Sequence, residues 1–242
     1  MGEDMVISDR EVYVHCTLYC VQCTLSRVSA ATTEREPLDR DAIVARAVAF
    51  ADDRGTDALS MRKLAAELGY EVMSLYNHVV NKAEVLALMV DAVAAEIPLP
   101  DIGADPLVAV RALAVDTRAA LVRHPWAASL WLRQLPGPAR IRHMEHHLAA
   151  LAATDMTPSV AHLAFHAVNN HVIGYTLQEQ AMAYVVPAGG DPDALARTFM
   201  EGLPADELPH TVAHIRQHLD GDTASSFELV LDLILDGLAR TT

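Results

Sequence analysis

The sequence has no apolar run long enough to cross a bilayer. Acidic residues interrupt its longest ones, Asp91 after Val85–Val90 and Asp232 after Leu229–Leu231. A spanning helix needs about 20 such residues. The first eleven residues, MGEDMVISDRE, are acidic where a secretory signal would be basic. We therefore expect a cytoplasmic protein with no membrane partner.

Cysteine is also scarce, and all three cysteines, Cys16, Cys20 and Cys23, fall in one short segment. An odd, clustered set does not make a disulfide framework. Their spacing is that of a cluster-binding loop in radical enzymes, but nothing downstream resembles the barrel that such an enzyme requires. We interpret residues 1–36 as a poorly ordered extension or the product of an upstream start codon. Iron–sulfur or thiol sensing is the alternative.

Positive charge is in short supply. The chain has 18 Lys+Arg against 32 Asp+Glu, a net charge of −14, which argues against nucleic-acid binding. However, the only two lysines, Lys63 and Lys82, both lie in residues 60–82, where three cations face two acidic side chains. An acidic body with a neutral-to-basic DNA-reading segment suits a repressor that binds its operator specifically and binds random DNA weakly.

Enzyme signatures are missing as well. The chain contains no G-x-S-x-G, P-loop, G-x-G-x-x-G or H-E-x-x-H motif and no paired-carboxylate context, so we expect neither an enzyme nor a cofactor. Its 52% hydrophobic content excludes a disordered chain. The alternating run VYVHCTLYCVQCTL in residues 1–36 has no visible partner strand. Proline and glycine clusters divide the rest into periodic apolar segments, which predicts an all-α body.

Residues 37–97 carry short helical signals. The first helix shows apolar residues at helical spacing: Ile43, Val44, Ala47, Val48 and Ala51. Ser60 is a good N-cap for a helix over Met61–Leu68, and a glycine follows it. A third helix is predicted over about Glu71–Val79, and Asn81 caps a fourth, with Glu84 as a reciprocal cap. Two short helices joined by a glycine turn indicate a helix-turn-helix, with a generic helical bundle as the alternative.

Leu38–Leu86 contains L-S-M-R-K-L-A, then L-G, L-Y-x-H-V and N-K, and it resembles the DNA-binding domain of the tetracycline-repressor (TetR) family. His146–Gln180 resembles the tetracycline-repressor class of C-terminal domain more loosely. The resemblance implies an all-α chain in which a three-helix helix-turn-helix DNA-binding domain, residues 37–97, joins a larger helical ligand-binding and dimerisation domain, residues 105–242.

Carried over residue by residue, the resemblance implies DNA contacts on the short helices and just after them. Tyr76, His78 and Lys82 match phosphate-contacting positions. Val72 and Met73 offer no hydrogen bond to a base edge, so sequence readout would rest on Arg62, Ser74 and methyl contacts. The full expected set is Ser60, Arg62, Lys63, Glu71, Val72, Met73, Ser74, Tyr76, His78 and Lys82.

In the family, the long helix and the last helix form an intersubunit four-helix bundle. The expected body helices run to about Val122 and over 124–132, 138–153, 157–184, 208–219 and 224–238. The last one carries a continuous apolar stripe: Phe227, Leu231, Ile234, Leu235 and Leu238. This stripe fits a homodimer, although a helix buried inside a monomer would look the same.

The body is expected to bind a small-molecule effector through a mixed aromatic and amide pocket. The candidates are Trp126, Trp131, Gln134, His147, His166, Asn170, Tyr175 and Gln178. The resemblance places Trp131 and Gln178 where the tetracycline repressor holds its magnesium chelate with a histidine and a carboxylate. Leu113 and Thr117 replace its contacting Asn and Phe. Because indole cannot ligate Mg²⁺ and an amide ligates it poorly, we expect a different, fairly apolar ligand.

Histidine is abundant, at 12 residues, and three groups have i,i+4 spacing: His143/His147, His162/His166 and His210/His214/His218. Metal sensing is an alternative, but no cysteine or clear carboxylate completes a set, so we expect no metal. His146 and His147 are candidates for pH sensitivity.

The leading hypothesis is a homodimeric repressor that binds double-stranded DNA at a pseudo-palindromic operator and is released by a ligand other than tetracycline–Mg. The alternative is a helical small-molecule-binding protein, or an enzyme, that has lost operator reading.

Overall fold

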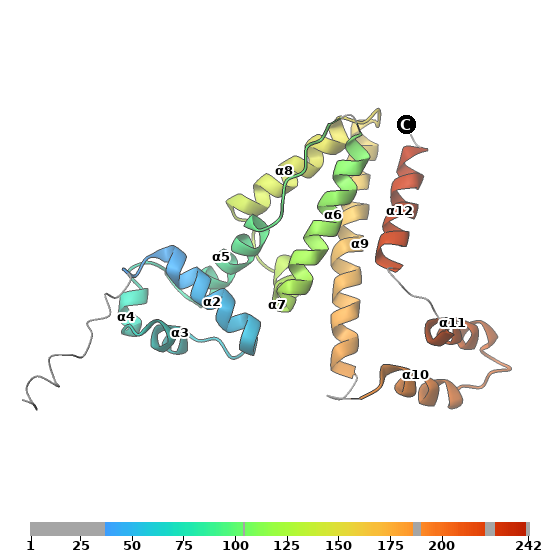
Figure 1. The fold of residues 1–242 in the computed structure, drawn as a ribbon, viewed down its shortest axis with the longest axis horizontal. Coiled ribbons are helices and arrows are strands. Elements are labelled where there is room, and N and C mark those ends of the chain that lie inside the picture. The colour runs from blue at the N-terminus through green and yellow to red at the C-terminus, as the bar shows by residue number, and fades with distance from the viewer. Residues whose placement is uncertain (1–36, 104, 186–189, 221–225, 241–242) are drawn as a thin grey trace, which may run out of the picture. The chain divides into compact units, whose positions relative to one another are not determined.

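A computed structural model describes residues 37–103, 105–185, 190–220 and 226–240, which are helical with no strand (Figure 1). The predicted extension, with its three cysteines, lies outside the described residues. No helix in the described part combines the length and apolar character that a membrane crossing requires. The helices are α2 (Arg40–Arg54), α3 (Met61–Leu68), α4 (Val72–Leu75), α5 (Lys82–Ala95), α6 (Pro106–Arg123), α7 (Pro125–Trp131), α8 (Pro138–Ala152), α9 (Pro158–Val185), α10 (Pro192–Glu201), α11 (Pro209–Asp220) and α12 (Ser226–Ala239).

The head, which we define as α2 to α4 with the start of α5, begins and ends its helices at the predicted caps. The Ser60 hydroxyl accepts from the Lys63 N–H at 3.2 Å, and Gly69, with φ 70°, ends α3 in the left-handed region. Asn81 Oδ1 accepts from the Glu84 N–H at 2.9 Å. The Glu84 carboxylate accepts from the Val80 N–H, so the reciprocal bond falls one residue earlier than predicted.

The predicted length of the third helix is wrong. α4 covers only Val72–Leu75. After it, the Asn77 and His78 N–H groups donate to the carbonyls of Ser74 and Leu75, three residues back, which tightens the chain into a turn. At the N-terminal end of α4, Glu71 is the N-cap residue, and its side chain makes no hydrogen bond to the free N–H groups of the first turn.

One apolar core fixes the head. Ile43 of α2, Leu64 of α3, Leu75 of α4 and Val85 of α5 are all fully buried. α2 packs on α3 and α5, and α3 packs on α4. Because α5 also packs on α6, α7 and α8, it belongs to both the head and the body.

The body is built around α9, which packs on α6, α7, α8 and α12 (Figure 1). The Arg118 guanidinium of α6 accounts for part of this packing. It donates twice to Glu179 of α9, at 2.8 and 2.6 Å, and lies over the Phe227 ring of α12. α8 is fixed at its start by Asp91 of α5, whose carboxylate accepts from the N–H groups of Ala139 and Arg140.

The body helices agree with prediction to within about two residues at most ends, with two differences. α10 lies where we expected only a glycine and proline loop, and Asp191 caps it. The apolar stripe of α12 faces its own chain, since Phe227, Leu231 and Leu235 are buried. Ile234 and Leu238 of the stripe are half-buried, and Leu229 and Leu233 of α12 are exposed.

Candidate functional site

The expected DNA-contacting residues lie on α3, on α4 and around the start of α5. Arg62, Lys63, Glu71, Met73 and Tyr76 are exposed. Met73, at 69% exposure, and Tyr76, at 43%, are large side chains that the head does not use in its core. The remaining members of the set are half-buried: Ser60, Val72, Ser74, His78 and Lys82.

Ion pairs neutralise part of the acidic charge of the head. Glu67 pairs with Arg54 of α2 at 2.8 Å, and Glu84 pairs with Arg40. The two lysines instead bond backbone carbonyls, Lys63 Nζ with Ala58 at 3.0 Å and Lys82 Nζ with Thr56 at 3.1 Å. Among the described residues no carboxylate pairs with either lysine, so both keep their charge available for phosphate.

The structure divides the eight expected ligand-binding residues into separate groups. Trp126 and Gln134 line a groove, whereas Trp131 and His147 are buried in the body. Tyr175 is half-buried with its ring 5.4 Å from that of Phe227. The other three lie on the exposed side of α9: His166, Asn170 and Gln178.

The groove, of about 1230 Å³, lies between the head and the body. The end of α2 and the start of α5 form one wall, and residues of α6, α7 and α9 form the other. Its charged lining includes Asp52, Lys82 and Glu179, and Trp126 supplies its aromatic surface.

A buried polar cluster occupies the contact between α6, α8 and α9. The Thr117 hydroxyl donates to the Leu113 carbonyl at 2.6 Å and accepts from His143 Nε2 at 2.9 Å. Asn169 Nδ2 donates to the Phe165 carbonyl at 2.8 Å and lies 3.4 Å from His147 Nδ1. Aromatic rings border both histidines.

His147 carries the one buried histidine nitrogen, Nε2, that finds no hydrogen-bond partner among the described residues. Because Asn169 donates toward Nδ1, the proton of the neutral ring belongs on Nε2, which is then an unused donor. Burial lowers the pKa of His143 and of His147 to about 4, with neighbouring histidine charges adding to the effect. His147 is thus neutral near pH 7, and its pH sensitivity is a prediction for more acidic conditions.

Sequence reasoning missed Asn169 and chose its neighbour Asn170, which is exposed. The signal for Asn169 was its phase on the helix. It shares a face with Phe165, Val172 and Thr176, at spacings of three or four residues. Of the predicted i,i+4 histidine groups, the pair His162 and His166 forms a ring contact, with centroids 4.6 Å apart. Within the described part, no group of three or more potential ligands could hold a metal ion.

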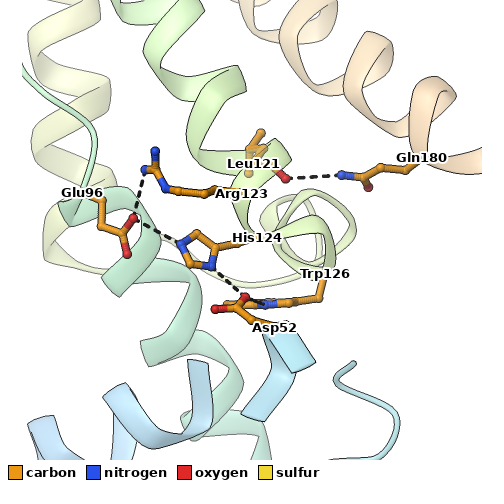
Figure 2. A network of polar contacts seen from close by, with 7 residues as sticks. All are labelled: Asp52, Glu96, Leu121, Arg123, His124, Trp126 and Gln180. Carbon is orange, nitrogen blue, oxygen red and sulfur yellow. Dashed lines mark hydrogen bonds and ion pairs between the residues drawn. The ribbon is translucent and has the colours of Figure 1, made fainter. Parts of the chain in front are cut away.

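A polar network joins the head to the body at the start of α7 (Figure 2). His124 Nδ1 lies 2.8 Å from Asp52 Oδ1 of α2, and the same oxygen accepts from Trp126 Nε1 at 2.7 Å. His124 Nε2 lies 3.2 Å from Glu96 Oε2, which also accepts from Arg123 Nη2 at 3.0 Å. None of this network except Trp126 was expected from sequence.

The other end of α7 is fixed to α8. The Arg140 guanidinium donates to the carbonyls of Trp131 and Gln134, at 2.6 and 3.0 Å, and lies over the Trp131 ring. That ring also meets His143 edge-on, with centroids 6.3 Å apart. This short helix therefore connects the buried polar cluster with the network at Asp52.

Comparison with known proteins identifies the family to which this helical head and body belong. Residues 43–89 match the family description "Bacterial regulatory proteins, tetR family", and residues 99–242 match "Tetracyclin repressor-like, C-terminal domain". The chain belongs to the TetR family. An HTH-type transcriptional regulator of Saccharopolyspora erythraea is 36% identical over 207 residues, which cover 84% of this chain and 86% of that protein.

Two further comparisons cover a similar share of the chain. The HTH-type transcriptional repressor DrrR1 of Streptomyces coeruleorubidus is 31% identical over 208 residues, covering 83% of this chain and 77% of that one. The crystal structure of Streptomyces coelicolor ActR in complex with actinorhodin superposes with a TM-score of 0.73 at 28% identity, covering 84% of this chain and 98% of that one.

The two positions that the resemblance assigns to a magnesium chelate offer no metal ligand set in this TetR-family chain. Trp131 is buried against Arg140 and His143. Gln178 lies on the exposed side of α9. No carboxylate belongs to the buried polar cluster among the described residues.

Proposed function

We propose that this TetR-family regulator is a homodimeric repressor that binds a pseudo-palindromic operator and is released from it by a small molecule. The observation that carries the proposal is a helix-turn-helix head with unpaired lysines, joined through α7 to a body that buries an unused hydrogen-bond donor. The division into a DNA-binding domain over 37–97 and a ligand-binding and dimerisation domain over 105–242 is part of the proposal.

DNA reading is assigned to the exposed side chains of α3 and α4. Arg62, with five donors in a fork, is suited to a guanine edge or to phosphate, and exposed Met73 is suited to a thymine methyl group. Tyr76, His78 and Lys82 contact phosphates and so fix the register of the head on the duplex. Ser60, Lys63, Glu71, Val72 and Ser74 complete the proposed DNA-facing set.

The effector is proposed to bind at the buried polar cluster. The unpaired N–H on His147 Nε2 can donate to a carbonyl or hydroxyl oxygen of a ligand. The rings of Phe165 and Trp131 beside the two histidines favour a ligand with aromatic rings. A neutral histidine pair gives no preference for a charged ligand. ActR, with a similar fold, binds actinorhodin. A tetracycline–Mg chelate fits poorly because the cluster holds no carboxylate ligand for Mg²⁺.

The dimer is proposed to form through α9 and α12. Leu163 of α9 is 65% exposed, and Leu229 and Leu233 of α12 are 64% and 62% exposed. These exposed leucines lie on two helices that pack on each other, and exposed large apolar side chains indicate an interface. A two-fold dimer places two heads about one DNA turn apart.

Release is proposed to work through α7. A ligand beside His147 would displace Trp131 or Arg140, and α7 would carry the displacement to Trp126 and its partner Asp52 on the head. To empty the operator, the ligand must favour the released head position by about 5 kcal/mol. The chain is then a regulator and not an enzyme, and its site of action is the cytoplasm, with the DNA.

The test is a fluorescence-anisotropy titration of the full chain against its own upstream intergenic DNA, with random DNA as competitor, at several salt concentrations. We expect saturable binding that survives competitor and is lost in the double variant Arg62→Ala/Lys82→Ala, with Arg142→Ala/Arg197→Ala as the matched control on the body. Wild-type binding that random DNA abolishes would leave a TetR fold whose head no longer reads an operator.

The ligand assignment has its own test. A thermal-shift screen of aromatic carbonyl compounds should give stabilisers whose effect is lost in His147→Phe. Stabilisation by tetracycline with Mg²⁺ and by no other compound would refute the assignment.

A further inference from the structure

We propose that His124 is a protonated clamp that joins the head to the body and makes operator affinity fall as the pH rises. This inference rests on the proposed function for its DNA readout, although the clamp itself can be tested without DNA. The name "clamp" refers to His124 with its two acceptors, Asp52 and Glu96 (Figure 2).

The number of hydrogen-bond donors is the first argument. Both ring nitrogens of His124 lie at hydrogen-bond distance from a carboxylate oxygen, 2.8 Å for Nδ1 and 3.2 Å for Nε2. An ionised carboxylate only accepts, and a neutral imidazole carries a single N–H. Both contacts can therefore be hydrogen bonds only when the ring is the imidazolium ion.

The charges around the ring are the second argument. Asp52 faces it from α2, Glu96 from the end of α5 and Arg123 from the end of α6, while Trp126 of α7 meets it edge-on at 5.9 Å. With His124 protonated, two cations balance two carboxylates. Loss of the proton leaves one excess negative charge and turns a nitrogen lone pair toward a carboxylate. The side chain of His124 is only 10% exposed, so water reaches the ring nitrogens poorly, although the side chains of Asp52 and Glu96 are 33% and 41% exposed.

The position of Asp52 links the clamp to DNA binding. Asp52 lies in the last turn of α2, which belongs to the head and packs on α3, whereas Glu96 is the C-cap of α5, a helix that packs on the body. His124 belongs to the body, at the junction of α6 and α7. An intact clamp thus restricts the head to one position, whereas an opened one allows several. A dimer that must present two heads at one spacing binds more weakly when each head is less restricted.

Of the other histidines near the head or the buried polar cluster, only His78 would give a pH dependence of the same sign. His143 and His147 stay neutral near pH 7 because burial lowers the pKa of each to about 4. His146 Nε2 contacts the Pro100 carbonyl, away from the head. His78, in the proposed DNA surface, would bind phosphate better when protonated and so gives a dependence of the same sign. The diagnostic quantity is therefore the difference between wild type and a His124 variant.

The experiment measures operator affinity of the full chain from about pH 6 to about pH 8.5 at constant ionic strength. We expect wild type to lose roughly threefold to tenfold more affinity over this range than His124→Gln, the size of one charge-assisted hydrogen bond. Glu96→Gln is the second variant, because its amide can donate to a neutral ring and keep the clamp closed. It should bind at about pH 8.5 more tightly than wild type and show the shallow pH profile of His124→Gln.

His146→Gln is the matched control and should keep the wild-type profile. Identical pH profiles for wild type and His124→Gln would overturn the proposal, as would a Glu96→Gln variant that retains the full wild-type dependence. Thermal denaturation of each variant establishes that it is folded.

A second measurement needs no DNA. In protein labelled with ¹⁵N-histidine, NMR at about pH 6 should show both ring nitrogens of His124 protonated, and Asp52→Asn should remove this signature. A singly protonated ring would overturn the clamp even if operator binding depends on pH. If wild type binds no DNA at any pH, the proposed function fails and the NMR result still decides the clamp.

Discussion

Lowering the pH from 7 to 5 should destabilise the folded protein through its two buried histidines. Burial lowers the native pKa of His143 and of His147 from 6.5 to about 4. Their contribution to stability is therefore present above about pH 6.5 and is lost as the pH falls toward 4. Between these pH values the unfolded chain binds protons at the two histidines, whereas the native state leaves both histidines neutral. At pH 5 each histidine accounts for about 2 kcal/mol.

The two histidines are one helical turn apart and each charge opposes the other, so their effects do not simply add. We expect a total loss of between about 2 and 4 kcal/mol, which is a large part of the 5–15 kcal/mol typical of a folded protein. Urea denaturation at pH 7, 6 and 5 measures it, with the protomer concentration fixed because a dimer's stability depends on concentration.

Variants assign the loss to the cluster. His147→Gln removes one titrating group, so the remaining loss should be that of His143 alone, at most about 2 kcal/mol. His210→Gln, at an exposed position of α11, is the matched control and should keep the full loss. The reasoning fails if wild type is as stable at pH 5 as at pH 7, or if His147→Gln loses as much stability as wild type.

Three more predictions concern the DNA surface, the dimer and the packing of α8. Lys82→Ala should weaken binding to all DNA sequences and lower the salt slope by about one. An unchanged slope would remove Lys82 from the phosphate contacts. Leu233→Asp should convert the dimer to monomers in sedimentation, whereas Leu135→Asp, at a still more exposed position outside α9 and α12, should not. Gly137→Ala should cost about 1–2 kcal/mol in denaturant melts, since its Cβ would lie 2.5 Å from the Asp91 carboxylate carbon that caps α8. Gly202→Ala, whose Cβ meets only an ordinary 3.6 Å contact, should change stability by less than about 0.5 kcal/mol.

The head was largely predictable because its signals are local. Ser60 and Asn81 satisfy the free N–H groups of the helix that each begins, and Gly69 supplies the left-handed residue that ends α3. Such caps act over three or four residues, so the sequence around them is enough. The length of α4 was not predictable in the same way, because it depends on how Leu75 enters the core shared with α2 and α5.

The orientation of α9 was beyond local reasoning. This helix carries apolar residues on every side, and Leu163 is 65% exposed while Val168 and Val172 are buried. The helical phase that Asn169 shares with Phe165 and Val172 distinguishes it from exposed Asn170 only once the buried side of α9 is known. Exposed Leu163 lies among exposed polar residues of α9 and so obscures which side is buried.

The network at His124 could not be found from sequence for a different reason. Asp52, Glu96 and His124 each lie near a helix end, where a charged residue is ordinarily solvated. They are separated by 28 to 72 positions in the chain. Only the packing of α2 and α5 against the α6–α7 junction brings these three residues together. Packing between segments that are distant in the chain leaves no spacing pattern in the sequence.

The acidic net charge is reconciled with DNA binding by where the charges are paired. Counting residues 60–82 sets three cations against two acids, but Glu67 is neutralised from outside that window by Arg54. Arg62, Lys63 and Lys82 are then opposed only by Glu71 among the described residues of the window. Screening reduces interactions beyond about 8 Å at physiological salt, so the more distant body acts weakly on phosphates bound at the head. At lower salt, screening weakens, so the attraction between the head and phosphates and the repulsion between the acidic body and phosphates should both grow. That repulsion disfavours random DNA wherever the duplex passes close to the acidic body.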